Sequence, residues 1–133
     1  MLVDTNILID ILENDPIWAD WSLNQLRNQS QVHRMIINPI IFSELSMVFE
    51  TLEDLEEALA TMKLNVIEIP KSALFLAGRA FRQYRKRGGT KRNVLSDFFI
   101  GAQAAVSGIP IITRDPRRYA TYFPSVTLIS PTH

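Results

Sequence analysis

The chain has 133 residues, of which 47% are hydrophobic and 21% charged, values typical of one globular domain and not of a disordered chain. It contains no cysteine, which excludes a disulfide scaffold, a thiolate zinc site and a cysteine nucleophile, and suits a reducing cytoplasm. Fourteen basic residues balance fourteen acidic ones, so any nucleic acid must be held by local contacts rather than by bulk charge. No apolar run approaches the roughly 20 residues of a membrane helix, and we expect no membrane association.

Short apolar runs alternate with helical patterns along the chain. The pattern predicts strands at residues 1–3, 35–37, 66–69, 111–113 and 126–129, and helices at 5–13, 16–28, 39–49, from 51, 71–87, 94–107 and 116–122. Asn38 and Thr51 are expected to cap two helices at their starts, and Gly108 to cap another at its end. Strands separated by helices pair in parallel through right-handed crossovers. The prediction is one α/β domain over residues 1–133, with a mostly parallel sheet between helices.

Two acidic residues follow predicted strands. Asp4 ends the first strand, and Asp115 lies just beyond the strand at 111–113. Ligands of open parallel sheets bind in the crevice at the carboxyl ends of the strands. Either residue alone also fits a simple turn or helix start, because Asp is common where strands end.

Two further acidic residues lie on apolar sides of predicted helices. Glu44 falls in the apolar arc of its helical wheel, and Asp97 falls beside small residues, away from the polar stripe of its own helix. The apolar arc around Glu44 consists of Ile40, Ile41, Leu45, Val48 and Leu52. The polar stripe of the second helix consists of Ser96, Gln103 and Ser107, and the small residues beside Asp97 are Gly101 and Ala104. A structural ion pair for Glu44 and the helix dipole for Asp97 are the simpler explanations. The small residues beside Asp97 also predict that another element approaches closely.

Four carboxylates from four segments repel one another unless a cation lies among them. Hard divalent cations such as Mg²⁺ take oxygen ligands. One or two such ions suit phosphodiester hydrolysis, because the metal lowers the pKa of a bound water and neutralises phosphoryl charge. His33 and His133 lie outside the segments that carry the carboxylates, which disfavours a two-histidine ribonuclease mechanism.

With these positions identified, the chain resembles the PIN-domain nucleases, in particular the VapC-like toxins of toxin–antitoxin pairs, over essentially its whole length. The matching motifs are residues 2–6 with the first acid, 42–45 with the second, 95–102 with the third, and 112–116 with a strand-end hydroxyl and the fourth acid. All four motifs occur in order, at the right spacing and on the expected elements.

The resemblance implies a three-layer α/β/α sandwich with about five parallel strands, and endonucleolytic cleavage of RNA that depends on Mg²⁺ or Mn²⁺. It also implies a homodimer, silenced by a cognate antitoxin whose C-terminal segment occupies the site. Carried over to this chain, Asp4, Glu44 and Asp97 form the metal-binding core and Asp115 completes it. Asn6 and Thr113 are expected to orient carboxylates or waters, with a helix N-cap as an equal alternative for Asn6.

Two positions depart from the family pattern. Ser96 stands where many relatives have proline, and Gln103 where many have histidine. Neither change removes an acid, so both bear on substrate details rather than on catalysis.

Basic residues cluster in a loop that leads into the helix carrying the third acid. Arg87, Lys91 and Arg92 in this loop, and Arg114 beside the fourth acid, are candidates for contacts with RNA phosphates or with an acidic partner. The basic residues within the helix at 71–87 instead lie opposite its apolar face, and we expect that face to be solvated.

Three rival functions share parts of this pattern. A haloacid-dehalogenase-like phosphatase needs a second Asp two residues after the first, where this chain has Asn6. A receiver domain needs paired acids and a later strand-end lysine, to which Arg114 is a poor match. A non-catalytic PIN-like module that binds RNA or protein stays open, because intact acids permit catalysis without proving it.

Overall fold

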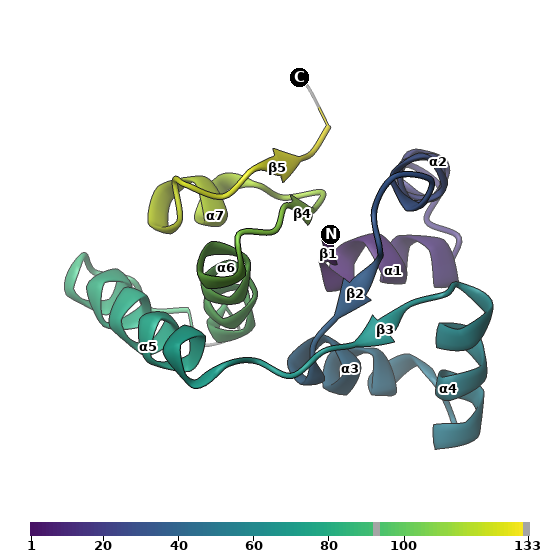
Figure 1. The fold of residues 1–133 in the computed structure, drawn as a ribbon, viewed down its shortest axis with the longest axis horizontal. Coiled ribbons are helices and arrows are strands. Elements are labelled where there is room, and N and C mark those ends of the chain that lie inside the picture. The colour runs from purple at the N-terminus through teal and green to yellow at the C-terminus, as the bar shows by residue number, and fades with distance from the viewer. Residues whose placement is uncertain (92–93, 132–133) are drawn as a thin grey trace.

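A computed structural model describes residues 1–91 and 94–131 of the chain. Five short strands form one sheet in the order β3-β2-β1-β4-β5, and each neighbouring pair is parallel (Figure 1). The strands are β1 (Leu2–Val3), β2 (Ile36–Ile37), β3 (Asn65–Val66), β4 (Ile111–Ile112) and β5 (Leu128–Ile129). The sheet topology predicted from the sequence is confirmed.

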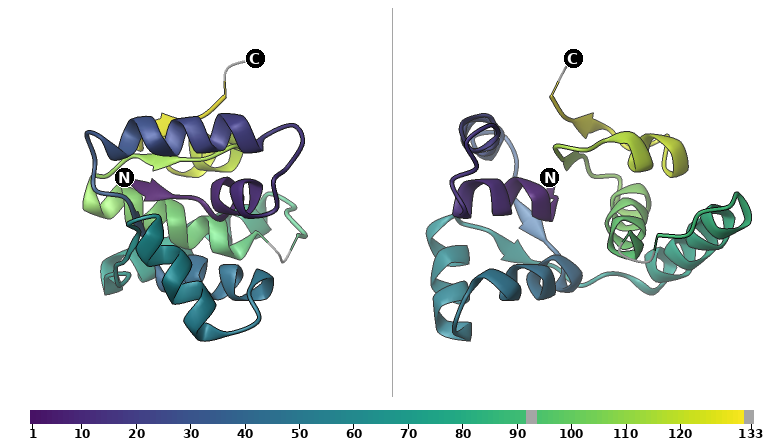
Figure 2. Two further views of the ribbon diagram at one scale, coloured as in Figure 1. Left: turned by 90° about the vertical axis from the view of Figure 1, so that its right-hand side faces the viewer. Right: turned by 180° about the vertical axis from the view of Figure 1, so that it is seen from behind.

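Helices cover both faces of this sheet. In the described ranges they are α1 (Thr5–Leu12), α2 (Ala19–Ser30), α3 (Pro39–Leu45), the 3₁₀ helix η1 (Ser46–Val48), α4 (Leu52–Thr61), α5 (Lys71–Lys86), α6 (Leu95–Ser107) and α7 (Arg117–Tyr122). Helices α1–α4 lie on one side of the strands and α5–α7 on the other (Figures 1 and 2). Right-handed crossovers require this division, because the chain runs from β1 out to β3 and then returns across the sheet to β4 and β5. The expected α/β/α sandwich is confirmed.

Three residues predicted to cap helices do so in the structure. The side chain of Asn38 accepts a hydrogen bond from the backbone N–H of Ile41 and caps α3, and Thr51 caps α4 through the N–H of Asp54. Gly108 ends α6 with a φ of 65°, a left-handed conformation that glycine adopts without steric cost.

Several predicted boundaries are wrong. Strand β3 ends at Val66 instead of Ile69, since it pairs with a β2 strand of only two residues. Helix α2 begins at Ala19 instead of Pro16, because the side chain of Asp15 caps a preceding turn through two backbone N–H groups.

The predicted apolar face of the Glu44 helix is also partly wrong. Helix α3 ends at Leu45 and continues as the 3₁₀ helix, whose tighter turn ends the 3.6-residue periodicity. As a result, Val48 and Leu52 are 39% and 56% exposed instead of buried.

The core is centred on β1, β4 and α6. Leu2, Ile111 and Phe98 are fully buried in it. Helix α6 approaches the end of α7 so closely that a Cβ atom on Gly101 would overlap the ring of Phe123, which confirms the predicted close approach beside Asp97. Within the described ranges, no helix has both the length and the apolar character needed to span a bilayer.

Candidate active site

The carboxyl ends of β1 and β4 bring Asp4 and Thr113 together. The two strands pair in register, with Val3 opposite Ile112, so the next residue of each strand lies beside the other. The backbone N–H of Asp4 donates to the carbonyl of Ile112 at 3.0 Å, and the hydroxyl of Thr113 donates to Asp4 Oδ2 at 2.8 Å. Thr113 therefore lies where the sequence places it, against the first acid.

Tyr119 is a second donor to Asp4 that the sequence analysis missed. It lies on α7, is 1% exposed, and its hydroxyl donates to Asp4 Oδ2 at 2.8 Å. Burial, followed by the charge of Asp4, raises the pKa of Tyr119 well above its ordinary value, so the phenol stays protonated and donates. Its only sequence signal is its place one helical turn after Asp115.

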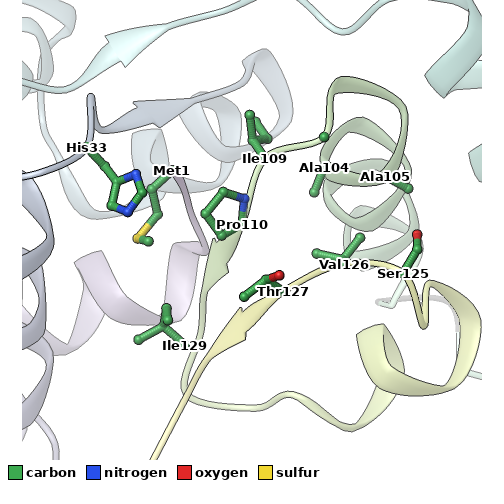
Figure 3. Close-up of a pocket in the computed structure, with 11 residues that line it drawn as sticks. Met1, His33, Ala104, Ala105, Ile109, Pro110, Ser125, Val126, Thr127 and Ile129 are labelled. Carbon is green, nitrogen blue, oxygen red and sulfur yellow. The ribbon is translucent and has the colours of Figure 1, made fainter.

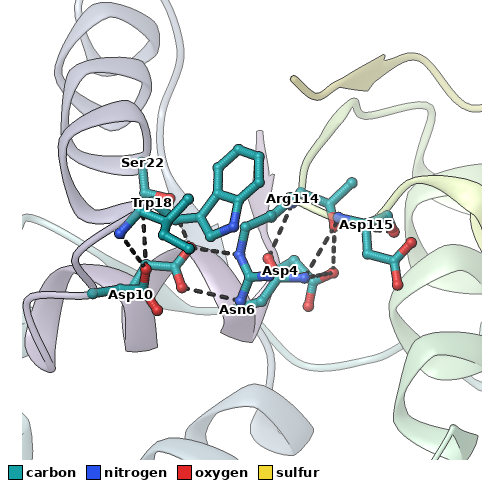
Figure 4. Close-up of polar contacts among 10 residues, drawn as sticks. Asp4, Asn6, Asp10, Trp18, Ser22, Arg114 and Asp115 are labelled. Carbon is teal, nitrogen blue, oxygen red and sulfur yellow. Dashed lines mark hydrogen bonds and ion pairs between the residues drawn. The ribbon is translucent and has the colours of Figure 1, made fainter. Parts of the chain in front are cut away.

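Asn6 connects the first acid to the end of β4. Its amide nitrogen lies 3.4 Å from both Asp4 Oδ2 and the hydroxyl of Thr113, and its oxygen accepts the backbone N–H of Arg114 at 3.1 Å (Figure 4). The N-cap alternative for Asn6 is wrong, since Asp4 occupies that position of α1. All the donors to the Asp4 carboxylate found among the described residues contact Oδ2, which leaves Oδ1 available as a ligand atom.

Each of the other three acids has its own partner. Glu44 is half-buried and accepts the hydroxyl of Thr5 at 2.6 Å, so a hydroxyl takes the place of the ion pair considered for it. Asp97, in the first turn of α6, pairs with Arg118 at 2.7 Å. Asp115 is exposed and pairs with Arg117 at 3.2 Å.

The pKa values show that the four carboxylates act on one another. Burial, the charge of Asp97 and, more weakly, that of Glu44 raise the pKa of Asp4 to about 6, against hydrogen bonds that lower it. Burial also raises the pKa of Asp97, where Arg118 opposes it and the charges of Glu44 and Asp115 add to it. Burial alone would raise the pKa of Asp115, but its hydrogen bond and charge interaction with Arg117 hold it below the ordinary value. The four acids therefore form one electrostatic cluster.

The donor set of this cluster fits a hard divalent cation. It consists of carboxylate and hydroxyl oxygens, which Mg²⁺ and Mn²⁺ prefer. The charges of Asp97 and Glu44 disfavour the ionised form of the buried Asp4, and a bound cation would offset them. Among residues 1–91 and 94–131, no three acidic or histidine side chains already converge as a formed metal site. Arg118 is the cation that contacts Asp97 in this arrangement. Metal binding at Asp4, Glu44, Asp97 and Asp115 stays a prediction.

A buried amide pair connects the helices that carry the second and third acids. Asn38, which caps α3, donates to the side chain of Gln103 on α6 at 2.9 Å, and Gln103 donates to the carbonyl of Glu68 at 3.2 Å. Gln103 is 1% exposed, so the polar stripe of α6 is buried at this position. The pair fixes α3 against α6 and thereby the spacing of Glu44 and Asp97.

The candidate RNA-contact residues differ in their surroundings. Nε and Nη2 of Arg114 donate to the buried carboxylate of Asp10, at 2.8 and 3.1 Å, and the guanidinium lies over the ring of Trp18 (Figure 4). Arg87 and Lys91 are exposed at the end of α5 and beyond it. Arg92 lies outside the described residues.

A separate cavity of about 270 Å³ lies at the opposite, amino ends of the central strands. Met1, Ile109, Pro110 and Val126 are among its lining residues (Figure 3). None of its lining residues is acidic. The acidic cluster is therefore at the other edge of the sheet, where parallel-sheet proteins bind their ligands.

Comparison with known proteins agrees with this geometry. A family model described as the PIN domain matches residues 1–124. The fold is similar to VapBC2 from Rickettsia felis bound to a promoter DNA fragment, with TM-score 0.72, 19% identity and coverage of 97% of this chain and 96% of that one. It is also similar to a toxin–antitoxin complex from Klebsiella pneumoniae, with TM-score 0.71, 21% identity and coverage of 98% and 97%. No curated protein matches by sequence.

Proposed function

The chain belongs to the PIN domain family, and on this basis we propose that it is a metal-dependent endoribonuclease of the VapC type, which hydrolyses phosphodiester bonds of RNA. The observation that supports this best is the coupled cluster of Asp4, Glu44, Asp97 and Asp115 at the carboxyl edge of the sheet. A divalent cation held by these residues would supply a water of lowered pKa and neutralise charge on the phosphoryl group.

The chain's own residues prepare the site for that chemistry. Thr113 and Tyr119 hold Asp4 through one carboxylate oxygen, Oδ2. Thr5 orients Glu44 in the same way. Because these donors are buried or half-buried, the carboxylates keep their positions without reorganisation when substrate arrives.

We further propose that an antitoxin protein is the physiological partner and that the chain acts as a homodimer in the cytoplasm. The support for an antitoxin is the fold shared with the Klebsiella pneumoniae toxin–antitoxin complex and the Rickettsia felis VapBC2 assembly. An inhibitor of this kind gains most by covering the carboxylate cluster, where a bound metal and its substrate would meet.

One observation favours a non-catalytic binding module instead. In the described residues no formed metal site is present, and Arg118 already neutralises Asp97. This alternative predicts a folded protein that binds RNA or protein but cuts no RNA in the presence of any divalent metal.

Cleavage of a mixed pool of structured RNAs by purified, partner-free protein separates the two functions. The reaction is run with Mg²⁺, with Mn²⁺ and with chelator, beside Asp97→Asn. Asp20→Asn is the matched control, because Asp20 is likewise in the first turn of a helix but is exposed and is not one of the four clustered acids. Discrete fragments that require metal, persist in Asp20→Asn and vanish in Asp97→Asn are the expected result.

The other outcomes are equally informative. Folded wild-type protein that binds Mn²⁺ but leaves the RNA pool intact would contradict the nuclease proposal. Cleavage that survives in Asp97→Asn would show that the cluster is not the site or that a contaminant cuts the RNA.

A further inference from the structure

A second cavity, of about 370 Å³, opens directly beside the carboxylate cluster. It lies between the end of α5 and helix α7. Its walls include Tyr84, Lys91, Asp115, Arg117, Arg118 and Tyr122. Asp115 belongs to the carboxylate cluster, and Arg118, which also lines the cavity, pairs with Asp97, so the cavity adjoins the cluster.

The charge of this cavity is opposite to that of the cluster. Three cations line it against one carboxylate, although the chain as a whole has no net charge. Arg117 is 89% exposed, and its pair with the 52% exposed Asp115 is of the kind that contributes little to stability. Arg117 and the exposed Lys91 are therefore free to exchange their present contacts for a phosphate.

Two tyrosines give the cavity aromatic walls. Their ring centroids lie 6.2 Å apart at an interplanar angle of 77°. The ring of Tyr84 is covered by Gly89 and by Arg118, and its hydroxyl accepts the backbone N–H of Lys91. Tyr84 therefore shapes the wall and is poorly placed to accept a base.

Tyr122 is better placed to accept a base. Its ring packs against Phe98, with centroids 5.2 Å apart, and the guanidinium of Arg87 lies over it at 5.4 Å. Arg87 is exposed at the end of α5 and can move. A base that enters here lies between an aromatic ring and a guanidinium plane, an arrangement that proteins use to hold unstacked bases of single-stranded RNA.

We propose that this cavity is a nucleotide subsite of the ribonuclease. It would bind one unstacked nucleotide of single-stranded RNA next to the phosphodiester at the carboxylates, with the base on Tyr122 and a phosphate on Arg117 and Lys91. This inference rests on the proposed function above and adds to it the residues that would hold the nucleotide beside the scissile phosphodiester. The volume lies at the small end of the roughly 300–1,000 Å³ typical of ligand pockets, which suits one nucleotide.

Binding without cleavage tests the subsite. A fluorescein-labelled pool of short single-stranded RNA oligonucleotides is titrated with protein in chelator, and anisotropy gives Kd at a series of salt concentrations. Arg117→Gln and Lys91→Gln are each expected to reduce the slope of log Kd against log salt by about 0.7. Arg82→Gln, an exposed change on α5 away from the cavity, leaves the slope unchanged.

The role of the Tyr122 ring in stacking is tested by comparing an aliphatic with an aromatic replacement. Tyr122→Leu is expected to weaken binding by roughly 5- to 150-fold with little change of salt slope, whereas Tyr122→Phe keeps binding near wild type. Circular dichroism checks that each variant is folded. Photo-crosslinking of an oligonucleotide carrying 5-iodouridine, mapped by mass spectrometry, gives a readout on unaltered protein and is expected to label Tyr122.

The outcomes distinguish this proposal from the nuclease itself. One outcome is that the protein cleaves RNA while substitution of Lys91, Arg117 or Tyr122 leaves oligonucleotide binding unchanged. This result would overturn the subsite proposal and leave the nuclease proposal intact. Binding through the cavity without cleavage in any metal would keep the subsite and overturn the nuclease. If Arg117→Gln abolishes binding of polyglutamate but not binding of RNA, the cavity binds an acidic protein partner and the subsite proposal is overturned.

Discussion

The Asp4→Asn variant tests whether the buried charge of Asp4 lowers the free energy of unfolding. The pKa of Asp4 is raised from 3.8 to about 6 in the folded chain, chiefly by burial. Between these two values the folded state binds more protons than the unfolded state, so the free energy of unfolding falls as pH rises through this window and is level above it. The pKa shift of Asp4 corresponds to about 3 kcal/mol of lost stability at neutral pH.

The Asp4→Asn variant is expected to recover the stability that the charge of Asp4 costs. Its side-chain oxygen still accepts the hydroxyls of Thr113 and Tyr119, while the buried charge is gone. We therefore expect the free energy of unfolding at about pH 7.5 to rise by roughly 1–3 kcal/mol, and the fall between about pH 4 and pH 6 to become shallower. Urea unfolding followed by far-UV circular dichroism in chelator, at several pH values, measures both effects.

Two further measurements complete this test. Asp20→Asn, at an exposed position, is expected to change stability by less than about 0.5 kcal/mol. Added Mg²⁺ is expected to stabilise the wild type, because a metal that binds only the folded state shifts the folding equilibrium. It is not expected to stabilise Asp4→Asn, which lacks one of the proposed metal-binding carboxylates. Destabilisation of Asp4→Asn by more than about 1 kcal/mol at neutral pH would refute the reasoning, since it would mean that the protein itself neutralises the carboxylate.

The remaining predictions concern the framework around the site. Arg114→Gln leaves the 2% exposed Asp10 without its cation and is expected to cost about 3 kcal/mol in urea unfolding, a result contradicted by a change below about 0.5 kcal/mol. Gly101→Ala places a Cβ against the ring of Phe123 and is expected to cost about 1–3 kcal/mol, seen as a lower Tm. Gly78→Ala is its matched control, because a Cβ in that helix meets no neighbouring atom and is expected to stabilise by up to about 1 kcal/mol.

The topology and the location of the site could be predicted from local signals. Apolar runs of strand length between helical patterns fix a parallel sheet, and strand ends then lie at one edge. Asp4 and Thr113 meet there because neighbouring strands end in register. The end of α6 at Gly108 was equally predictable, since its φ of 65° favours glycine over other residues.

What local signals missed depends on contacts between distant parts of the chain. The bond from Tyr119 to Asp4 joins residues 115 positions apart, and nothing in the periodicity of α7 distinguishes this tyrosine from a core aromatic. The burial of Gln103 could not be predicted, because the polarity of a residue does not show that Asn38 satisfies it in the core. The face of Glu44 was misjudged because a helical wheel assumes a constant pitch, which the 3₁₀ turn after Leu45 breaks.

The separation of charges at the site would allow a chain with no net charge to act on a polyanion such as RNA, as proposed above. Acidic side chains gather at the strand ends, while Lys91, Arg117 and Arg118 line the adjoining cavity, with Arg118 joining the two through Asp97. At physiological ionic strength the field of such a pair of groups fades within about 8 Å, so a distant RNA meets a neutral surface. The proposed subsite therefore predicts an association rate that depends weakly on salt, with the salt dependence of Kd carried by dissociation. Stopped-flow anisotropy measures both rates, and an association rate that falls steeply with salt would contradict this local mode of recognition.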